Sequence, residues 1–435
     1  MRKVLIVGYL WPYCRYKGGS PRTVGLANYL EEFGWEPIVL TAALDRNSIP
    51  QLKAEIIETS NRDIFYLWRE LFLLLGFSAN KSISGQLKEK IGVTSKKSFI
   101  DVLLSYYMTL FAYPDVEKHW RAFAIKSAND IFRKVKINAI ISTWPITAHL
   151  VAKELKSKYK IPWIADFSHL WSQGYNYQYG NIRKFIDRKL ELKTLSHADA
   201  LTTISTFFVD KLRELHLKKP IYSITHGFNP SLINTPASPL TDKFTIRYTG
   251  NIYPKKQKPS KLFESLRELI DNNIIDRKDI EVSFYGGRYG WLRKESEYYG
   301  VSDIVHQHDF ISQSLSVEKQ RESQILLHLG WDDNEIKGFY SSKIFEYLAA
   351  QRPILAIGGA SDEVVDDLML ETKAGVYSKE VEGIKEFIKK YYLEYKKDGR
   401  VNYIGDIDKI KKYSHREMAK KFADIMNELI IEYRR

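Results

Sequence analysis

Residues 338–364 predict a helix that places one carboxylate among apolar side chains. The stretch reads GFYSSKIFEYLAAQRPILAIGGASDEV, and Ser342 is of a type that caps a helix. Glu346 stands on the apolar face, where a carboxylate is costly unless it accepts strong hydrogen bonds. A ribose, with two adjacent hydroxyls, is a suitable bidentate donor. We therefore take Glu346 as a candidate ligand-binding residue.

A predicted strand at residues 244–250 (FTIRYTG) is followed by a cluster of positive charge. Asn251 comes directly after the strand, and Lys255, Lys256 and Lys258 occupy the loop before the next predicted helix. Cations beside a glycine-ended strand are well placed to neutralise a diphosphate, because charge-assisted hydrogen bonds to phosphate are strong. A solvated lysine loop is the alternative interpretation.

Glycines mark two further strand ends at which a phosphate could approach the backbone. Gly18 and Gly19 lie between the first predicted strand and the first predicted helix, whose N-terminal N–H groups would attract an anion. A plain glycine turn is the alternative there. Gly286 and Gly287 end another predicted strand, at the edge where an open α/β sheet keeps a crevice. The spacing G-x-G-x-x-G is absent after the first strand, which disfavours a dinucleotide-dependent enzyme.

The elements that must position these residues form two series. Apolar strand-like runs alternate with amphipathic helical stretches, which is the pattern of a parallel sheet covered by helices. One series begins at residues 3–8 (KVLIVG), and the second begins at residue 244 with further strands at 280–286, 324–329 and 353–357. Residues 228–242 (FNPSLINTPASPLTD) form the predicted linker. We therefore expect an α/β protein whose two halves, each with a parallel sheet, face a cleft.

Residues 45–130 fit the alternation of strands and helices least well, because an aromatic-rich sequence of helical character takes the place of clear strands. We predict a helical insertion in the first half. Core-facing aromatic side chains at helical spacing are one explanation of its composition. The other is an exposed apolar and basic face that would rest on a membrane surface or hold a lipid acceptor.

The composition indicates a folded protein with an anionic partner. The 435 residues are 44% hydrophobic, which suits two or three domains and excludes a disordered or fibrous chain. The formal net charge of +13 favours nucleic acid, anionic lipid or a phosphate-bearing substrate as partner. The single cysteine, Cys14, excludes an internal disulfide framework and favours a reducing compartment. The most apolar stretch, residues 64–77, is too short to span a bilayer.

The 338–364 segment resembles the nucleotide-sugar signature of family 4 glycosyltransferases and their relatives, in the variety common among bacterial surface-polysaccharide enzymes. Lys343 stands three residues before the helical Glu346, and Tyr347 and the strand-opening Pro353 match as well. Other motifs of the family occur along this chain in the same order as in the family. They are GGSPR at 18–22, PDVEKHW at 114–120, PWIADFSHLW at 162–171, THGFN at 225–229 and YTGN at 248–251. The resemblance covers most of the chain outside residues 45–110.

The resemblance implies the GT-B fold, with two Rossmann-like domains. It implies an acceptor domain at residues 1–227 that contains the helical insertion at 45–130, a donor domain at 240–412, and a helix at 413–435 that packs back on the first domain. The implied activity is sugar transfer from a nucleoside-diphosphate sugar, with retention of configuration and without metal or other cofactor. The implied acceptor is a glycan or lipid-linked oligosaccharide in capsule, O-antigen or exopolysaccharide synthesis.

Two other functions are compatible with the same sequence features. A nucleotide-sugar epimerase of the same fold and a non-catalytic scaffold of glycan synthesis are the alternatives. The order of the motifs makes nucleic acid the weakest of the anionic partners, which leaves the nucleotide diphosphate and an anionic membrane surface. We therefore expect a cytoplasmic protein that is peripheral on the inner face of the cytoplasmic membrane.

Carried over residue by residue, the resemblance assigns Glu346 to the donor ribose and Lys256, with Lys255, to the diphosphate. Gly18 and Gly19 would cradle a phosphate. The remaining donor-side residues that it implies are Asn251, Gly287, Gly338, Phe339, Tyr340, Lys343 and Glu363. The chain departs from the family pattern at three positions, with Gly338 in place of a first Glu, Asn251 in place of a frequent Arg, and His169 in place of a common Asp.

Two side chains are candidates for a general base. A retaining transferase of this type needs no strong base, because the leaving phosphate takes the acceptor proton, whereas an inverting one needs a carboxylate or a histidine. Asp166 lies at a predicted strand end and His169 in the loop after it. A neutral structural histidine is the alternative for His169. His306 and His308 lack further ligands at metal-binding spacing, so we expect no metal site.

Overall fold

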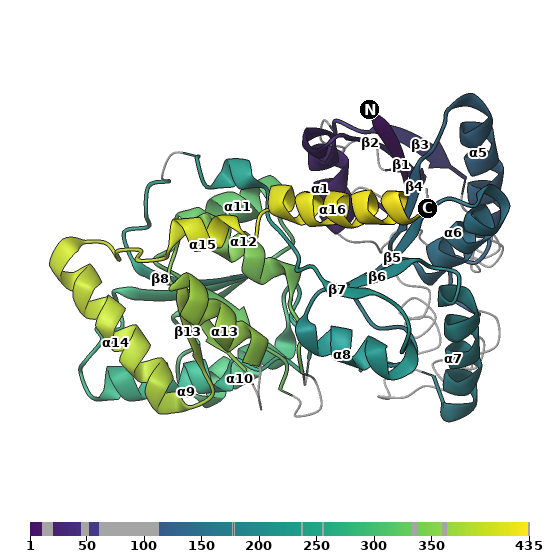
Figure 1. The fold of residues 1–435 in the computed structure, drawn as a ribbon. Coiled ribbons are helices and arrows are strands. Elements are labelled where there is room, and N and C mark those ends of the chain that lie inside the picture. Colours follow the sequence, from purple (N-terminus) through teal and green to yellow (C-terminus); the bar gives the residue numbers. More distant parts are fainter. Residues whose placement is uncertain are drawn as a thin grey trace, which may run out of the picture. The chain divides into compact units, whose positions relative to one another are not determined.

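A computed structural model of the chain describes residues 1–10, 21–44, 52–60, 113–175, 177, 179–235, 238–254, 256–332, 337–358 and 363–433. The chain divides into two compact units (Figure 1). The first unit comprises Met1–Thr203, Val209–Ile224 and Ala419–Arg435, and the second comprises Ile204–Phe208 and Thr225–Met418. The two units are described separately below.

The first unit contains a seven-stranded parallel sheet in the order β3-β2-β1-β4-β5-β6-β7. Its strands are β1 (Arg2–Val7), β2 (Trp35–Ala42), β3 (Glu55–Thr59), β4 (Ala139–Ser142), β5 (Trp163–Phe167), β6 (Ala200–Thr203) and β7 (Ile221–Ser223). Strands β4, β5 and β6 are buried along their whole length, as expected of parallel strands covered on both faces. The strand order reverses between β1 and β4, which makes this pair the switch point of a doubly wound sheet.

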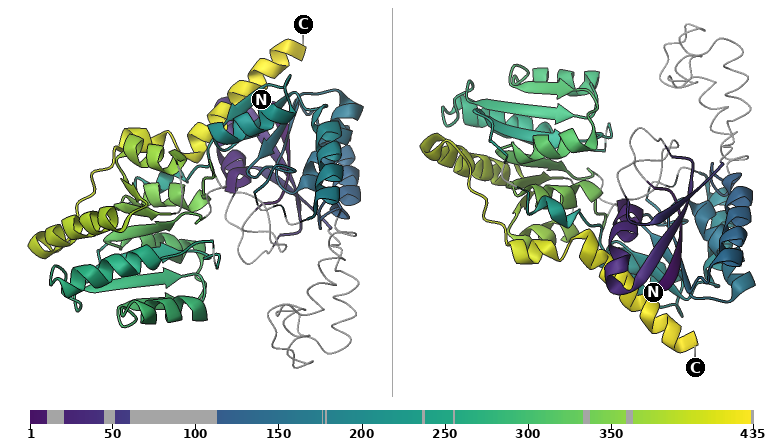
Figure 2. Two further views of the ribbon diagram at one scale, coloured as in Figure 1. Left: turned by 90° about the horizontal axis from the view of Figure 1, so that it is seen from below. Right: turned by 90° about the horizontal axis from the view of Figure 1, so that it is seen from above.

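The helices of the first unit connect these strands and cover the sheet. They are α1 (Pro21–Tyr29), the 3-10 helix η1 (Leu30–Phe33), α5 (Trp120–Lys134), α6 (Ile146–Tyr159), α7 (Asn181–Leu195), α8 (Thr206–Leu215) and the C-terminal α16 (His415–Tyr433). Helix α8 belongs to the first unit from Val209 on and α16 from Ala419 on, and both views of Figure 2 show α16 beside β1. Asn427 holds it there by accepting hydrogen bonds from Arg2 (2.7 Å) and from the Trp35 indole (3.2 Å).

The second unit repeats the same architecture with a six-stranded parallel sheet in the order β10-β9-β8-β11-β12-β13. Its strands are β8 (Phe244–Thr249), β9 (Ile280–Tyr285), β10 (Val305–His308), β11 (Ile325–Leu329), β12 (Ile354–Ile357) and β13 (Gly375–Ser378). Its helices are η2 (Pro230–Leu232), α9 (Ser260–Asp271), α10 (Gly290–Tyr298), α11 (Gln313–Arg321), α12 (Ser342–Ala350), α13 (Glu363–Thr372), α14 (Val381–Asp398) and α15 (Ile407–Lys411). One core cluster joins alternate side chains of β8, β9 and β11 to α9, α10 and α14.

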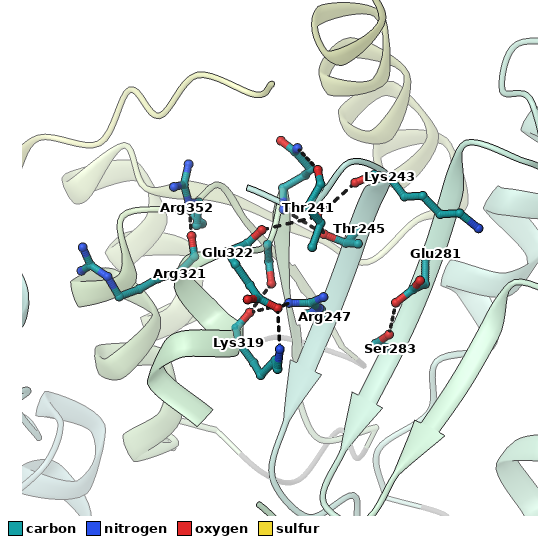
Figure 3. Close-up of polar contacts among 12 residues, drawn as sticks. Thr241, Lys243, Thr245, Arg247, Glu281, Ser283, Lys319, Arg321, Glu322 and Arg352 are labelled. Carbon is teal, nitrogen blue, oxygen red and sulfur yellow. Dashed lines mark hydrogen bonds and ion pairs between the residues drawn. The ribbon is translucent and has the colours of Figure 1, made fainter. Parts of the chain in front are cut away.

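Polar side chains tie β8 to α11 on the opposite face of the second sheet (Figure 3). The Arg247 guanidinium, on β8, donates to the Glu322 carboxylate and to the Lys319 carbonyl (3.1 Å) at the end of α11. The Lys319 ammonium also donates to Glu322 (2.9 Å). Arg247 is buried, so this shared carboxylate neutralises its charge inside the unit.

The α/β class with two parallel sheets is confirmed, and the structure adds three strands at sheet edges. Residues 55–59, within the predicted helical insertion, form edge strand β3, so that part of the prediction is wrong. Most of the insertion, residues 61–112, lies outside the described residues. His306 and His308 belong to edge strand β10, and β13 also went unpredicted. No helix in the described ranges has both the length and the apolar composition that crossing a bilayer requires.

Candidate functional site

The switch point of the second sheet is the place where two neighbouring strands separate. Strand β8 pairs with β11 only through Ile246 and Arg247. Beyond that point the Thr249 N–H donates to the Tyr347 hydroxyl of α12 (3.0 Å) and not to a strand. The Leu329 carbonyl at the end of β11 accepts instead from the Gln257 side-chain amide (2.7 Å). Because side chains satisfy the backbone groups that separation frees, the two carboxyl ends stay apart at the position where open α/β sheets bind ligands.

Two glycines allow the strand ends of β8 and β9 to approach each other closely. Gly250 and Gly286 have φ of +113° and +138°, in a region that other residues rarely adopt. A Cβ atom on Gly286 would lie 2.3 Å from the Gly250 carbonyl oxygen. A Cβ atom on Gly250 would lie 2.8 Å from the Lys343 Nζ and Cε atoms. The absence of side chains here therefore brings the Lys343 ammonium against the backbone at the end of β8.

Lys343 is a half-buried cation in the second unit whose charge no carboxylate of the described residues neutralises at close range. Its Nζ lies 3.7 Å from the centroid of the Tyr248 ring, and no described carboxylate oxygen lies within 4.0 Å of it. Burial lowers the pKa of Lys343 to about 7, and the more distant Glu346 carboxylate opposes this shift. An anionic ligand bound here would replace the missing counter-charge and favour the protonated amine.

Glu346 lies one turn further along α12 and is also half-buried. Burial raises the pKa of Glu346, while a hydrogen bond from the Gln320 side chain and the charge of Lys343 act in the opposite direction. The Gln320 amide also donates to Thr249 Oγ1 (3.0 Å), which links this group to the end of β8. The helix cap is Ser341, whose hydroxyl accepts from the Lys343 N–H (3.3 Å), so the prediction of Ser342 as the cap was wrong by one residue.

An aromatic group lies beside the second predicted cation, Lys256. The Lys256 Nζ lies 4.9 Å from the centroid of the Trp331 ring, and Trp331 stacks on Tyr253 with a centroid distance of 5.3 Å. The Asp332 N–H donates to the Lys256 carbonyl (2.6 Å), which holds the lysine loop against the end of β11. Sequence reasoning missed Trp331 and Tyr253. The position of Trp331 directly after the glycine that ends a buried strand was the signal that could have identified it.

Of the other predicted donor-side residues, Asn251 and Gly287 follow the ends of β8 and β9, and Gly338, Phe339 and Tyr340 lie in the loop before α12. The Asn251 carbonyl accepts from the Tyr248 hydroxyl (2.7 Å), and the Gly287 N–H donates to the His308 carbonyl (3.1 Å). Gly338 has a φ of +71°, the Phe339 ring lies 6.2 Å from that of Trp331, and the Tyr340 hydroxyl donates to the Val364 carbonyl (2.8 Å). Glu363 begins α13. Gly18, Gly19 and Lys255 lie outside the described residues.

Asp166 serves a different purpose from the one proposed for it. Its Oδ1 accepts from Arg22 Nη2 (2.8 Å) and from the Thr202 hydroxyl (2.6 Å), and its Oδ2 accepts from Arg22 Nε (2.9 Å). Both side chains of this bidentate pair are fully buried in the first unit. The Arg22 guanidinium further donates to the Ile224 carbonyl (2.7 Å). Because its oxygens are occupied, Asp166 braces α1 and the ends of β6 and β7, and we do not retain it as a base.

His169 lines a recess at the carboxyl ends of β4 and β5 in the first unit. The residues around this recess are Trp144, Ile146, His149, Asp166, Phe167, Ser168, His169 and Trp171. The His169 ring keeps exposed surface and lies edge-on to Trp144, with centroids 6.5 Å apart. Partial desolvation lowers the pKa of His169, so the imidazole is neutral near pH 7 and able to accept a hydrogen bond.

His149, by contrast, is a core residue. Its Nδ1 lies 2.7 Å from the Ser142 hydroxyl, its ring stacks on Phe167 at 4.5 Å, and burial lowers its pKa to about 3. His306 and His308 do not join a larger cluster, and the described part of the chain contains no group of three or more His, Cys, Asp or Glu side chains placed to hold a metal ion.

Comparison with known proteins identifies relatives by structure and not by sequence. No protein-family model and no curated protein matches the chain. Among solved structures, the sucrose-phosphate synthase of Thermosynechococcus elongatus is 12% identical with a TM-score of 0.60 over 99% of this chain and 100% of that one. An α,α-trehalose-phosphate synthase from Burkholderia xenovorans is 10% identical, with a TM-score of 0.57 over 98% and 100%. The lipopolysaccharide outer core galactosyltransferase WaaB is 12% identical, with a TM-score of 0.53 over the whole of both chains.

These likenesses extend over nearly the full length of each protein. At 10–12% identity they concern the fold, and they agree with the two doubly wound parallel sheets described above. The chain therefore has the GT-B fold, composed of two Rossmann-like domains.

Proposed function

We propose that this chain is a glycosyltransferase that moves a sugar from a nucleoside-diphosphate sugar to a glycan or lipid-linked oligosaccharide acceptor in surface-polysaccharide synthesis. The observation that carries the proposal is the pair Lys343 and Glu346 on α12, beside the separated ends of β8 and β11. Among the described residues, no carboxylate oxygen lies within 4.0 Å of the Lys343 ammonium. Two of the proteins with a similar structure are a sucrose-phosphate synthase and a lipopolysaccharide outer core galactosyltransferase, which supports this class of reaction.

In the proposed reaction, Glu346 accepts hydrogen bonds from the donor ribose while Lys343 and Lys256 bind the diphosphate. The bond between the anomeric carbon and the diphosphate oxygen breaks, and the acceptor hydroxyl oxygen forms a bond to the same face of that carbon. The acceptor proton passes to a diphosphate oxygen. The ammonium groups stabilise the charge that develops on the leaving diphosphate, so this step requires neither a metal nor a strong protein base, and configuration is retained.

We assign the acceptor to the recess of the first unit that contains His169 and Trp144. A neutral imidazole accepts a hydrogen bond from a sugar hydroxyl, and an indole face packs against the apolar face of a sugar ring. The net charge of +13 further supports work at the inner, anionic face of the cytoplasmic membrane, where a lipid-linked acceptor would be available.

Replacement of Glu346 by alanine tests the proposal. A panel of nucleoside-diphosphate sugars is screened for ligands that raise the melting temperature of the wild-type protein, because a ligand that binds only the folded state stabilises it. With the ligand so found, we expect Glu346→Ala to weaken binding by about 10-fold to 100-fold, since a bond to a charged acceptor contributes about 1.5–3 kcal/mol. Glu318→Ala, which removes an exposed carboxylate from α11, is the matched control and should bind normally.

Three results would contradict the proposal. The first is the absence of any thermal shift with every nucleoside diphosphate tried. The second is conversion of the bound nucleotide sugar into an isomer without transfer, which would favour the epimerase. The third is binding without turnover on any glycan or lipid-linked acceptor, which would favour the scaffold.

A further inference from the structure

Helix α7 has large apolar side chains on its outside. The exposed fractions of Ile182, Phe185, Ile186 and Leu192 are 81%, 56%, 43% and 39%. Their spacing of three, four and seven residues places them on one face of the helix. In an ordinary surface helix such a face points into the core. The apolar face of α7 is instead exposed.

Charged side chains occupy the inward face of α7. Arg183, Asp187 and Glu191 are all buried. The Arg183 guanidinium pairs with Asp187 (3.1 Å), which also accepts from the Tyr177 hydroxyl (2.5 Å). Glu191 accepts from the Ser172 N–H (3.0 Å). Rotation of the helix to bury its apolar face would break these partnered charges, which costs several kcal/mol when a buried pair is separated. The outward orientation is therefore fixed by the inward contacts.

The outward face of α7 is cationic as well as apolar. Lys189 and Lys193 lie among the exposed apolar side chains, exposed Arg188 flanks them, and both acidic residues of the helix are buried. The Lys189 Nζ lies 4.4 Å from the centroid of the Phe185 ring, so the charge accompanies the apolar surface. The pKa of Lys153, on α6, is lowered mainly by burial and further by repulsion from the Lys193 charge. No acidic side chain of the described residues forms an ion pair with Lys189 or Lys193, so positive charge lies beside the exposed apolar side chains.

We propose that the outward face of α7 docks on the surface of an anionic lipid bilayer. Apolar side chains that enter the acyl boundary and cations that meet the headgroups are the combination by which interfacial helices bind such surfaces. An apolar protein partner would leave Lys189 and Lys193 unmatched, and nucleic acid would leave four large apolar side chains in water. The proposal deepens the membrane association included in the proposed function, on which it rests, by naming the surface responsible.

Vesicle binding tests the proposal with the full chain and two double variants. Vesicles of phosphatidylcholine mixed with phosphatidylglycerol should bind the wild-type protein at low salt, and vesicles of phosphatidylcholine alone should bind it weakly. Lys189→Gln with Lys193→Gln should reduce partitioning by about 30-fold, because each lysine near an anionic surface contributes about fivefold. Ile182→Ser with Phe185→Ser should reduce binding to both compositions. All four side chains are exposed, so the fold should be retained.

The matched controls lie on other helices and surfaces. Lys389→Gln with Lys390→Gln removes two exposed lysines from α14, and Leu217→Ser removes an apolar side chain that is 84% exposed in the first unit. Both controls should bind vesicles as the wild type does. Equal binding by the α7 variants and the wild type, or absence of wild-type binding to the anionic vesicles, would overturn the proposal.

Two further measurements separate this proposal from its competitors and from the proposed function. Conversion of oligomers to monomers by Ile182→Ser with Phe185→Ser, without a change in vesicle binding, would identify the face as a contact between copies and overturn the proposal. The thermal shift with a nucleotide sugar should be unchanged in every α7 variant. Loss of vesicle binding with this shift retained supports the α7 surface, whereas failure of the shift in the wild type contradicts the proposed function alone.

Discussion

The two sheets have the same strand order at their switch points, yet only the second one opens there. In the first unit, pairing between β1 and β4 continues past both strands, through the Thr143 N–H to the Val7 carbonyl (2.9 Å) and the Tyr9 N–H to the Trp144 carbonyl (3.0 Å). In the second unit, pairing between β8 and β11 ends at Arg247, and side chains replace the missing strand partners. Two sheets with the same strand order can therefore differ in whether they offer a ligand site at the switch point.

The cations near the two switch points differ in whether a carboxylate of the same unit pairs with them. The cation near the first switch point, Arg22, is fully buried and has a bidentate carboxylate in Asp166. The cation at the second, Lys343, has no described carboxylate within 4.0 Å. Removal of one partner from a buried ion pair leaves an uncompensated charge and destabilises the fold, whereas a charge left without a counter-ion is available to a ligand. The comparison predicts that mutation of the first cation affects folding and mutation of the second affects binding.

The largest effect is expected from removal of Arg22. Arg22→Ala would leave the Asp166 carboxylate buried without its partner, which should lower the free energy of unfolding by about 3–5 kcal/mol. Chemical denaturation followed by circular dichroism measures this change. Arg133→Ala, which removes an arginine that is 77% exposed beside Asp130, is the matched control and should change stability by less than about 0.5 kcal/mol. Similar losses in the two variants would contradict the structural role assigned to the Arg22 pair.

The next effect is expected from removal of Lys343. Lys343→Ala should reduce the rate of sugar transfer by about 10²-fold to 10³-fold, because one preorganised contact to the charge of the transition state is lost, while the unfolding free energy changes little. Steady-state transfer assays measure the loss. Lys385→Ala serves as control, since that lysine on α14 pairs with Glu268 (2.7 Å) and Glu382 (2.7 Å). Transfer by Lys343→Ala at the rate of the control would break the proposed difference between paired and unpaired cations.

The smallest expected effect is a pH dependence of donor affinity. Because the pKa of Lys343 is about 7 without ligand, the amine is neutral above that pH and the bound diphosphate must restore its proton. Affinity for a nucleotide sugar, whose diphosphate does not titrate near neutrality, should thus be greatest below about pH 7 and fall by up to about tenfold per unit above it. Titration calorimetry between about pH 6 and about pH 9 measures this slope.

A change of lysine to arginine sharpens the same measurement. Lys343→Arg carries a charge that does not titrate in this range, so its affinity profile should be flat. An equally steep profile in the arginine variant would show that another group titrates on binding and would remove the role assigned to the amine.

The central strands and the α/β class were predictable from sequence because buried parallel strands carry long apolar runs. Strands β8 and β9 were predicted to within one residue for this reason. The edge strands were missed because they bury less surface. Strand β10 (VHQH) has no fully buried residue and lacks the apolar run that marks a buried strand, so its histidines were considered only as metal ligands and set aside. Residues 55–59 (EIIET) likewise have only two adjacent isoleucines between charged side chains, in a region whose neighbours are aromatic.

The candidate site was predictable where residues are close in sequence and not where the fold brings distant ones together. Lys343 and Glu346 lie three residues apart on one helix, so their proximity follows from helical geometry. The pair Arg22 and Asp166 joins positions 144 residues apart, and sequence alone suggested a base where the fold has a buried brace. Trp331 and Gln257 contribute through tertiary contacts that no local pattern indicates.

The hydroxyl of Tyr347 gives the end of β8 an unusual dependence on a helix. Two successive amides of that strand end have different partners, since the Thr249 N–H donates to Tyr347 of α12 (3.0 Å) and the Gly250 N–H donates to the Tyr285 carbonyl of β9 (2.6 Å). Solvent exchange at Thr249 therefore reports local opening of the helix that carries Lys343 and Glu346, and exchange at Gly250 reports separation of the strands. Neighbouring protons on one backbone thus record the motions of the ligand-binding helix and of the sheet independently.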